Sequence, residues 1–283
     1  MKFILEELEY QKSAIASVVK VFEGQEKNTF DNSFFFEIQS NITSLTTEEI
    51  AANKLAIIEE NGLAASQCSL SDENDFCIEM ETGTGKTIVY IQTIYELYKH
   101  YGLTKFIIVV PSIAIKEGIL ATLEKFEDQL ATVYGEKIHW FEYDSKKLTR
   151  LKHFISDTQP QIMVMTIQSF TADDRIINQE GRDDAFLGMS YIKALGKCQP
   201  VIIMDEPQEG MDTDNAIARF ADFNPLCKLR YSATHKVLKN LLYRLTPYDA
   251  YQQGLVKKIE VLSVAEKNDE ATLKIEITQT QTA

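Results

Sequence analysis

The stretch METGTGKT at residues 80–87 has the composition of a loop that binds a phosphate chain. It matches the pattern G-x-x-x-x-G-K-[ST], except that Met80 replaces the first glycine, at the end of the preceding strand. Gly83 and Gly85 would let backbone N–H groups converge on a phosphate. Lys86 would reach the β- and γ-phosphates, and the Thr87 hydroxyl would ligate Mg²⁺. The alternative is a chance glycine-rich turn, but the strand–loop–helix context favours an ATP site formed by Thr82, Gly83, Thr84, Gly85, Lys86 and Thr87.

Two adjacent acids follow a second apolar run. Asp205 and Glu206 come directly after VIIM at 201–204. The Asp205 carboxylate is therefore expected at the carboxyl end of a strand, where it would hold Mg²⁺ through water. Glu206 is then placed to polarise the attacking water, so we assign catalytic roles to both acids and to Lys86. Two surface acids after a buried strand are the alternative, which the earlier phosphate loop disfavours.

A third element, YSATH at residues 231–235, brings small hydroxyl residues into the series. Ser232 and Thr234 can hydrogen-bond to the acidic motif and transmit the presence of a γ-phosphate. We group Gln208, just after the acidic pair, with them as coupling residues. Alone, Ser-Ala-Thr is a plausible end of any strand, and only its order after the other two motifs is informative. His235 would either sense the nucleotide state or cap a following helix.

The elements that must position these residues are visible as short apolar runs. These are FCIEM, FIIVV, IMVM and VIIM, at residues 76–80, 106–110, 162–165 and 201–204. Amphipathic stretches separate them, such as residues 88–102, where Gly102 suits a helix C-terminus. Continuous apolar strands between helices predict an α/β fold with a parallel sheet covered on both faces. Ligands of such sheets bind at the carboxyl ends of the strands, where the three motifs fall.

One ATP-binding domain is predicted over residues 1–258, with an insertion at about 23–75. The insertion is polar, turn-prone and rich in acids, and a helix is expected within it at about 46–61. Residues 259–283 are expected to begin a connection to a second lobe that this chain lacks. Their weak alternation is typical of an exposed strand with a polar tail.

Composition limits the classes of function. With 29 basic and 42 acidic residues the net charge is −13, so a nucleic-acid partner would need a local basic groove or another domain. The four cysteines form no C-x-x-C pair, and reduced buried thiols are expected. Early glutamates exclude an export signal, and no apolar run is long enough to cross a membrane. We expect a cytoplasmic protein with no membrane partner.

GTGKT, DEPQ and SAT, in this order, resemble the first motor domain of superfamily 2 helicases and translocases. The resemblance implies a P-loop NTPase (RecA-like) fold, here the first motor lobe only, that uses ATP and Mg²⁺. LEYQKSAI at 8–15 resembles the adenine-recognising segment of that superfamily, which implies that Gln11 contacts the base. Residues 109–118 and 164–170 resemble the two stretches that track the sugar–phosphate backbone of one strand.

DEPQ, in place of D-E-A-D or D-E-A-H, resembles the Res subunit of type III restriction–modification enzymes. Residues 169–179 and 243–261 resemble it too. The resemblance implies an ATP-driven motor on double-stranded DNA that works beside a methyltransferase (modification) subunit. In the family a separate C-terminal nuclease domain cleaves DNA, and the second lobe supplies an arginine to the ATP site. Because this chain ends at Ala283, before either part, we expect a fragment, a truncated product or one piece of a split protein, with slow ATP hydrolysis.

Candidate DNA contacts are hydroxyl, amide and amine groups after two of the strands, which would bind phosphates without reading sequence. They are Ser112, Lys116, Thr166, Gln168 and Ser169. The basic stretch 144–154, in which Lys146 and Arg150 are expected to share a helical face, is an alternative contact or a solvated surface. Two other functions stay open: the first lobe of another superfamily 2 DNA or RNA helicase, and a truncated nucleotide-binding or interaction module without turnover.

Overall fold

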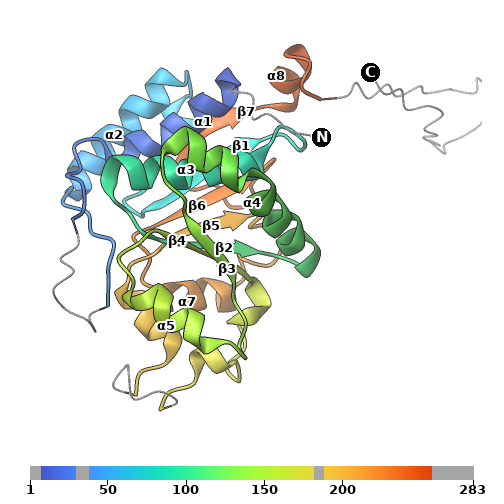
Figure 1. Cartoon of the computed structure of the whole chain (residues 1–283). Helices are drawn as coiled ribbons and strands as arrows, with labels where there is room; N and C mark the ends of the chain where they lie inside the picture. Colours follow the sequence, from blue (N-terminus) through green and yellow to red (C-terminus); the bar gives the residue numbers. More distant parts are fainter. Residues whose placement is uncertain (1–7, 30–37, 182–187, 257–283) are drawn as a thin grey trace, which may run out of the picture.

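The computed structural model describes residues 8–29, 38–181 and 188–256 (Figure 1). Within these ranges one sheet has seven strands in the order β3-β4-β2-β5-β6-β1-β7, and every neighbouring pair is parallel. The predicted parallel α/β sheet is therefore confirmed. The expected C-terminal strand and the connection at 259–283 lie outside the described residues, as does the predicted domain end at 258.

The four apolar runs all form strands, and the amphipathic stretch after the glycine-rich loop forms a helix, as predicted. The strands are β1 (Asp75–Met80), β2 (Lys105–Val110), β3 (His139–Glu142), β4 (Gln161–Thr166), β5 (Val201–Asp205), β6 (Cys227–Ser232) and β7 (Leu241–Leu245). The helices are α1 (Glu9–Val19), α2 (Thr47–Glu60), α3 (Lys86–Tyr101), α4 (Ile113–Tyr134), α5 (Leu148–Ser156), α6 (Tyr191–Lys197), α7 (Asp214–Asp222) and α8 (Pro247–Gln252). Short 3₁₀ turns are η1 (Lys20–Phe22), η2 (Ala65–Gln67), η3 (Ile167–Ser169) and η4 (Ile176–Asn178).

Helices cover both faces of the sheet because successive strand residues point to opposite sides. In β2, Phe106, Ile108 and Val110 belong to the core under α1, α3 and α4. Ile107 and Val109 belong to the second core, under α5, α6 and α7. All of these side chains are fully buried. Figure 1 shows α1 and α3 on one side of the sheet and α5 and α7 on the other. The two cores hold the strands rigidly and leave their carboxyl ends free to carry a site.

The described part of the predicted insertion packs into the domain. Its helix α2 matches the expected helix closely and begins with a capping box between Thr46 and Glu49. The preceding segment brings the buried Asn41 to the amino end of β2, where its Oδ1 accepts from Thr104 N at 2.8 Å and its Nδ2 donates to Lys105 O at 2.9 Å. The segment thus supports the sheet at the edge opposite the motifs.

One local prediction is wrong. Lys146 and Arg150 do not share a helical face, because α5 begins only at Leu148. Lys146 lies before the helix, in a turn where its N–H donates to Asp144 Oδ1 at 2.9 Å. An aspartate that accepts from the backbone two residues later forms an Asx turn, which competes with helix formation.

The buried, reduced thiols expected from the composition are found in the structure. All four cysteines, Cys68, Cys77, Cys198 and Cys227, are buried and free. Burial raises the pKa of the Cys77 thiol to about 12, which keeps it protonated.

In the described ranges, none of the helices has both the length and the apolar character needed to span a bilayer.

Candidate functional site

The loop between β1 and α3 carries the predicted phosphate-binding residues at the carboxyl edge of the sheet. Met80 is the buried last residue of β1, as predicted, and α3 begins at Lys86. Gly83 and Gly85 have φ angles of +86° and +88°, in the left-handed region that favours glycine. A Cβ atom at Gly85 would lie 2.6 Å from Gln11 Nε2, so a larger residue there would displace that side chain. The loop therefore needs glycine at this position for two reasons.

Two side chains of α1 hold the loop from outside. The Tyr10 hydroxyl donates to Thr84 O at 2.9 Å, and Gln11 Nε2 donates to the same oxygen at 3.0 Å. The buried Thr84 donates through Oγ1 to Glu81 O at 2.6 Å. Thr82 is exposed, and its N–H donates to Glu81 Oε1 at 2.8 Å. Gln11 therefore touches the loop itself, beside the place where a nucleotide base is expected.

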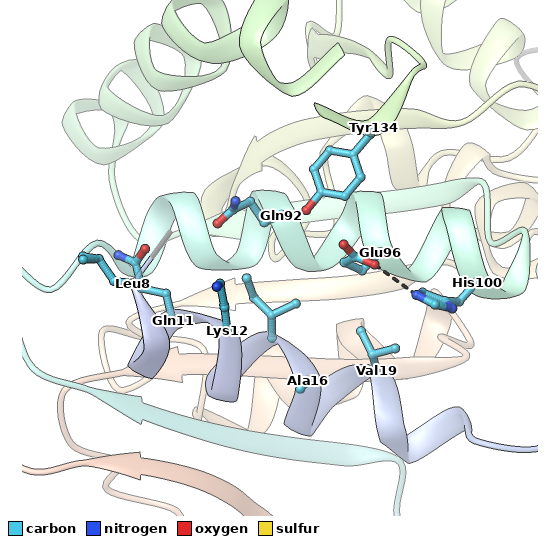
Figure 2. A pocket seen from close by; sticks show the side chains of 10 residues that line it. Leu8, Gln11, Lys12, Ala16, Val19, Gln92, Glu96, His100 and Tyr134 are labelled. Atoms are coloured by element: carbon cyan, nitrogen blue, oxygen red, sulfur yellow. Dashed lines mark ion pairs between the residues drawn. The ribbon is translucent and has the colours of Figure 1, made fainter. Parts of the chain in front are cut away.

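A groove of about 330 Å³ opens beside Gln11 between α1 and α3 (Figure 2). On α1, Lys12 lies beside Gln11 and is followed by apolar residues, whereas α3 contributes Gln92 and the ion pair between Glu96 Oε2 and His100 Nε2, at 3.1 Å. Tyr134, the last residue of α4, lies on the side of the groove opposite α1 (Figure 2). Gln11 thus borders both the groove and the glycine-rich loop.

The acidic pair lies across β6 from this loop. Asp205 is the buried last residue of β5, and Glu206 follows with a φ of +52°, which is uncommon for a residue other than glycine. Lys86 Nζ is 2.9 Å from Glu206 Oε1, and these side chains are only 11% and 21% exposed. Lys86 also donates to Met80 O at 3.3 Å. Two motifs far apart in the sequence therefore meet in one ion pair.

The Ser-Ala-Thr element joins the same cluster at the end of β6. Ser232 Oγ lies 2.6 Å from Glu206 Oε2 and 3.0 Å from Gln208 Oε1. Gln208 Nε2 donates to Glu206 Oε2 at 2.7 Å. Thr234 takes part through its backbone N–H, which donates to Ser232 Oγ at 3.2 Å. The three predicted coupling residues and Glu206 thus form one hydrogen-bonded network.

The two adjacent carboxyl groups have opposite pKa shifts. Burial, and after it the charge of Glu206, raises the pKa of Asp205 to about 6. Burial alone would raise the pKa of Glu206 as well. Hydrogen bonds from Ser232, Gln208 and Lys86 outweigh that effect and hold the pKa of Glu206 below its ordinary value. Glu206 is therefore an anion at neutral pH, which a base or water-orienting group must be.

His235 does not cap a helix, because the next element is the strand β7. Its backbone N–H and its Nδ1 each lie 3.3 Å from Glu79 Oε1, on β1. Arg244, on β7, donates through Nε to Glu79 Oε2 at 2.5 Å. Burial would raise the pKa of Glu79, but these hydrogen bonds outweigh it and lower the pKa. One nearly buried carboxylate therefore ties together the ends of β6, β1 and β7.

The candidate DNA contacts that follow β2 already have partners in the fold. Ser112 caps α4, its Oγ accepting from Ile115 N at 3.3 Å. Lys116 Nζ pairs with Glu142, the last residue of β3, and its side chain is only 12% exposed. A phosphate that bound Lys116 would therefore compete with this carboxylate.

The candidates that follow β4 lie at the same edge, beside a hollow of about 440 Å³. Thr166 Oγ1 lies 3.0 Å from Ser169 Oγ, and Gln168 Nε2 donates to Pro111 O at 2.9 Å. Three acids, Glu142, Asp144 and Asp174, also line this hollow. The DNA candidates thus form a group of their own at the β2–β4 end of the edge, apart from the Lys86–Glu206 cluster.

The N–H groups and oxygen ligands at the loop fit ATP with Mg²⁺. The first turn of α3 has no side-chain cap, so its N–H groups remain available for an anion. Thr87 and Asp205 offer oxygen ligands, which Mg²⁺ prefers, and the Tyr90 hydroxyl donates to Asp205 Oδ2 at 3.3 Å. Among the described residues no cluster of three or more His, Cys, Asp or Glu could hold a metal alone.

Four residues near the site escaped prediction from the sequence. Tyr10 and Tyr90 contact the loop and Asp205, while Glu79 and Arg244 fix the segment that follows Ser232. Only Tyr90 could have been identified from the sequence, because it lies one helical turn after Thr87 and therefore on the same face of α3. The other three depend on which strands and helices become neighbours.

The raised pKa of Asp205 predicts that Asp205→Asn stabilises the chain when Mg²⁺ and nucleotide are absent. The folded chain holds the Asp205 proton up to about pH 6, but the unfolded chain loses it near the ordinary value of 3.8. Stability from this group is therefore complete below that value and is lost as the pH rises through about 6. We expect Asp205→Asn to raise the free energy of unfolding at pH 7.5 by roughly 2–3 kcal/mol, and by little below pH 4.

Thermal unfolding followed by circular dichroism across pH 4–8 would measure this difference. Asp128→Asn, at an exposed position on α4, is the matched control and should leave stability unchanged. An Asp205→Asn chain no more stable than the parent at pH 7.5 would contradict the prediction.

Comparison with known proteins agrees with this geometry. Residues 4–237 match the family model described as "Type III restriction enzyme, res subunit". The chain is 29% identical to the type III restriction-modification enzyme EcoPI Res subunit of Escherichia phage P1, over 89% of this chain and 28% of the relative. It is also 29% identical to the EcoP15I Res subunit of Escherichia coli, over 91% of this chain and 29% of the relative. The chain thus spans under a third of the length of these curated relatives.

Among solved structures, the fold is similar to a nuclease-deletion mutant of the type ISP restriction-modification enzyme LlaGI in complex with a DNA substrate mimic. That likeness has a TM-score of 0.44 and 16% sequence identity, and it covers 71% of this chain and 20% of the other. The family model covers well over half of the chain and includes the glycine-rich loop, the acidic pair and the Ser-Ala-Thr element. With these three motifs joined at one sheet edge, the chain belongs to the family of type III restriction enzyme Res subunits.

Proposed function

We propose that this chain is the ATP-binding first motor lobe of a Res subunit, in which ATP hydrolysis drives movement along double-stranded DNA. The observation that carries the proposal is the contact of Lys86 and Ser232 with opposite oxygens of Glu206. These three side chains lie in one cluster, and the proposal makes them the phosphate-binding lysine, the water-orienting acid and the coupling hydroxyl. Residues 1–258, with the segment 23–75 included, would form the lobe.

The roles of the individual residues follow from their positions. The loop N–H groups and Lys86 would bind the β- and γ-phosphates, and Thr87 with Asp205 would hold Mg²⁺, which neutralises charge on the phosphates. When Lys86 turns towards a phosphate, it leaves Glu206 Oε1 free to accept a proton from water. Ser232 holds the other oxygen of Glu206 in place, so the carboxylate keeps its orientation during that change. Catalysis and phosphate binding would thus share one lysine.

Gln11 is proposed to contact the adenine base. Its amide group borders the groove, and its Nε2 donates to Thr84 O and to the Tyr10 hydroxyl. With Nε2 engaged in this way, Oε1 would accept a hydrogen bond from the amino group of adenine. Base recognition and the position of the phosphate loop would then depend on the same side chain.

The group at the ends of β2 and β4 is proposed to bind the backbone of double-stranded DNA. Ser112, Lys116, Thr166, Gln168 and Ser169 would contact phosphates, and Lys116 would exchange Glu142 for a phosphate oxygen. Sequence recognition and cleavage would belong to other parts of the enzyme: a modification subunit and a nuclease domain. The curated relatives are named as subunits of restriction-modification enzymes, which supports this division. A cytoplasmic location suits such an enzyme and stays a prediction.

An arginine for the transferring phosphoryl group would come from a second lobe. Of the five described arginines, Arg219, Arg230 and Arg244 pair with carboxylates, while Arg150 lies on α5 and Arg175 lines the hollow beside the end of β4. Loss of such an arginine lowers the rate by about 10³–10⁵-fold. We therefore expect this chain alone to bind ATP·Mg²⁺ but to hydrolyse it at least about a thousandfold more slowly than the complete enzyme.

The test compares nucleotide binding and DNA-stimulated ATP hydrolysis by this chain and by the complete enzyme. Binding with slow turnover supports the proposal. Failure to bind ATP would refute the nucleotide site, and fast DNA-stimulated hydrolysis by the chain alone would refute the need for a second lobe. Movement on RNA but not on double-stranded DNA by the complete enzyme would instead favour another superfamily 2 helicase.

A further inference from the structure

Tyr90 connects the two elements that carry the proposed Mg²⁺ ligands. It lies on α3, one turn after Thr87, and its side chain is fully buried. Its hydroxyl donates to Asp205 Oδ2, at the end of β5, at 3.3 Å. Tyr90 therefore joins the helix that carries Thr87 to the strand that carries Asp205.

The Tyr90 ring is itself held firmly. It packs edge-on against the Tyr231 ring, with centroids 5.5 Å apart and planes at 62°. The Tyr231 hydroxyl lies 3.3 Å from Thr93 Oγ1, and Tyr231 O accepts from Glu206 N at 2.9 Å. The two tyrosines therefore support both acids, one through a side-chain hydroxyl and the other through the backbone.

A donor at this position has a clear physical effect on a metal-binding carboxylate. Asp205 is 6% exposed, so water cannot orient it freely. The Tyr90 hydroxyl donates to Oδ2, so Oδ1 would be the oxygen offered to the ion. Mg²⁺ demands near-ideal octahedral geometry, so a carboxylate that can rotate binds it less well. Groups that orient metal ligands typically contribute 10–100-fold to metal affinity.

We propose that Tyr90 is a positioning residue that holds Asp205, across from Thr87, in the orientation required for Mg²⁺. This inference rests on the proposed ATP·Mg²⁺ site. Tyr90 would act on the ion through Asp205 and through the packing of α3 against β6.

The test uses Tyr90→Phe, which keeps the ring and its packing but removes the hydroxyl. Tyr95→Phe is the matched control: Tyr95 lies on the same helix, is 3% exposed, and accepts from Ile138 N at 3.4 Å, away from the acids. The measurements are the Mg²⁺ concentration for half-maximal binding of a fluorescent ATP analogue, and Mn²⁺ binding by electron paramagnetic resonance with ADP present. Near-UV circular dichroism checks the fold.

We expect Tyr90→Phe to raise the metal concentration required by about 10–100-fold. Nucleotide binding measured with EDTA should stay unchanged, and Tyr95→Phe should behave like the parent chain. A folded Tyr90→Phe chain with the parent's metal dependence would overturn the inference. So would an equal loss of nucleotide binding with and without metal, because that marks a general structural role. A parent chain that binds nucleotide without any metal dependence would refute the proposed Mg²⁺ site, and the role of Tyr90 with it.

Discussion

Replacing Lys86 with alanine should lower the affinity of this chain for ATP·Mg²⁺ by about a hundredfold or more, and should abolish turnover. The ammonium group is expected to donate to oxygens of two phosphates, and a hydrogen bond to a charged group contributes about 1.5–3 kcal/mol. Two such bonds correspond to at least two powers of ten in the dissociation constant. Glu206 would also lose its ion-pair partner at 2.9 Å and would be left as a partly buried anion next to the incoming phosphates.

Equilibrium binding of a fluorescent ATP analogue, with unlabelled ATP as competitor, measures this loss. Lys99→Ala is the control, since Lys99 lies on the same helix but at its far end and is 58% exposed. Affinity within twofold of the parent in the Lys86→Ala chain would show that the phosphates bind elsewhere.

Glu206→Gln should separate binding from chemistry. Glutamine keeps the size of the side chain and can still accept from Ser232 and Gln208, so the network that holds it survives. It cannot take a proton from water, and general-base catalysis contributes about 10²–10⁴-fold. We therefore expect the hydrolysis rate to fall by about that factor while the ATP dissociation constant changes little.

Single-turnover hydrolysis of radiolabelled ATP, with protein in excess, isolates the chemical step. Glu209→Gln makes the same change at an exposed acid three residues later and should leave the rate unaltered. The assignment of Glu206 fails if Glu206→Gln hydrolyses ATP as fast as the parent in the complete enzyme. A simultaneous loss of ATP affinity would instead indicate that Glu206 acts by positioning Lys86.

Much of the fold could be predicted because its strands are buried on both faces. Four apolar runs bounded by polar residues predicted β1, β2, β4 and β5. In the short strand β7, Arg244 interrupts the apolar run, and the strand pairs with β1 at the edge of the sheet. The shared helical face expected for Lys146 and Arg150 is absent, since a turn at Asp144 delays the start of α5. Local turn chemistry and edge pairing are the two effects that periodicity does not report.

The candidate site, too, could be predicted only in part. Lys86, Asp205, Glu206 and Ser232 could be placed together because each follows or precedes a strand end at a common edge. Their supporting contacts could not. For Tyr90 the sequence offers only its spacing from Thr87, and the role of its hydroxyl depends on the approach of Asp205. Sequence motifs therefore identify groups that face the ligand, whereas the groups that orient them depend on the tertiary structure.

The contacts of Glu79 affect how the strands β6, β1 and β7 would respond to a pulling force. Its two oxygens join the segment after β6 to Arg244 on β7, and β7 runs directly into α8. A force applied through α8 along β7 would therefore be shared with β6 and β1 instead of separating β7 from the sheet. The strand that carries Ser232 and the strand that leads into the phosphate loop would move together, as one stiff body, under that load.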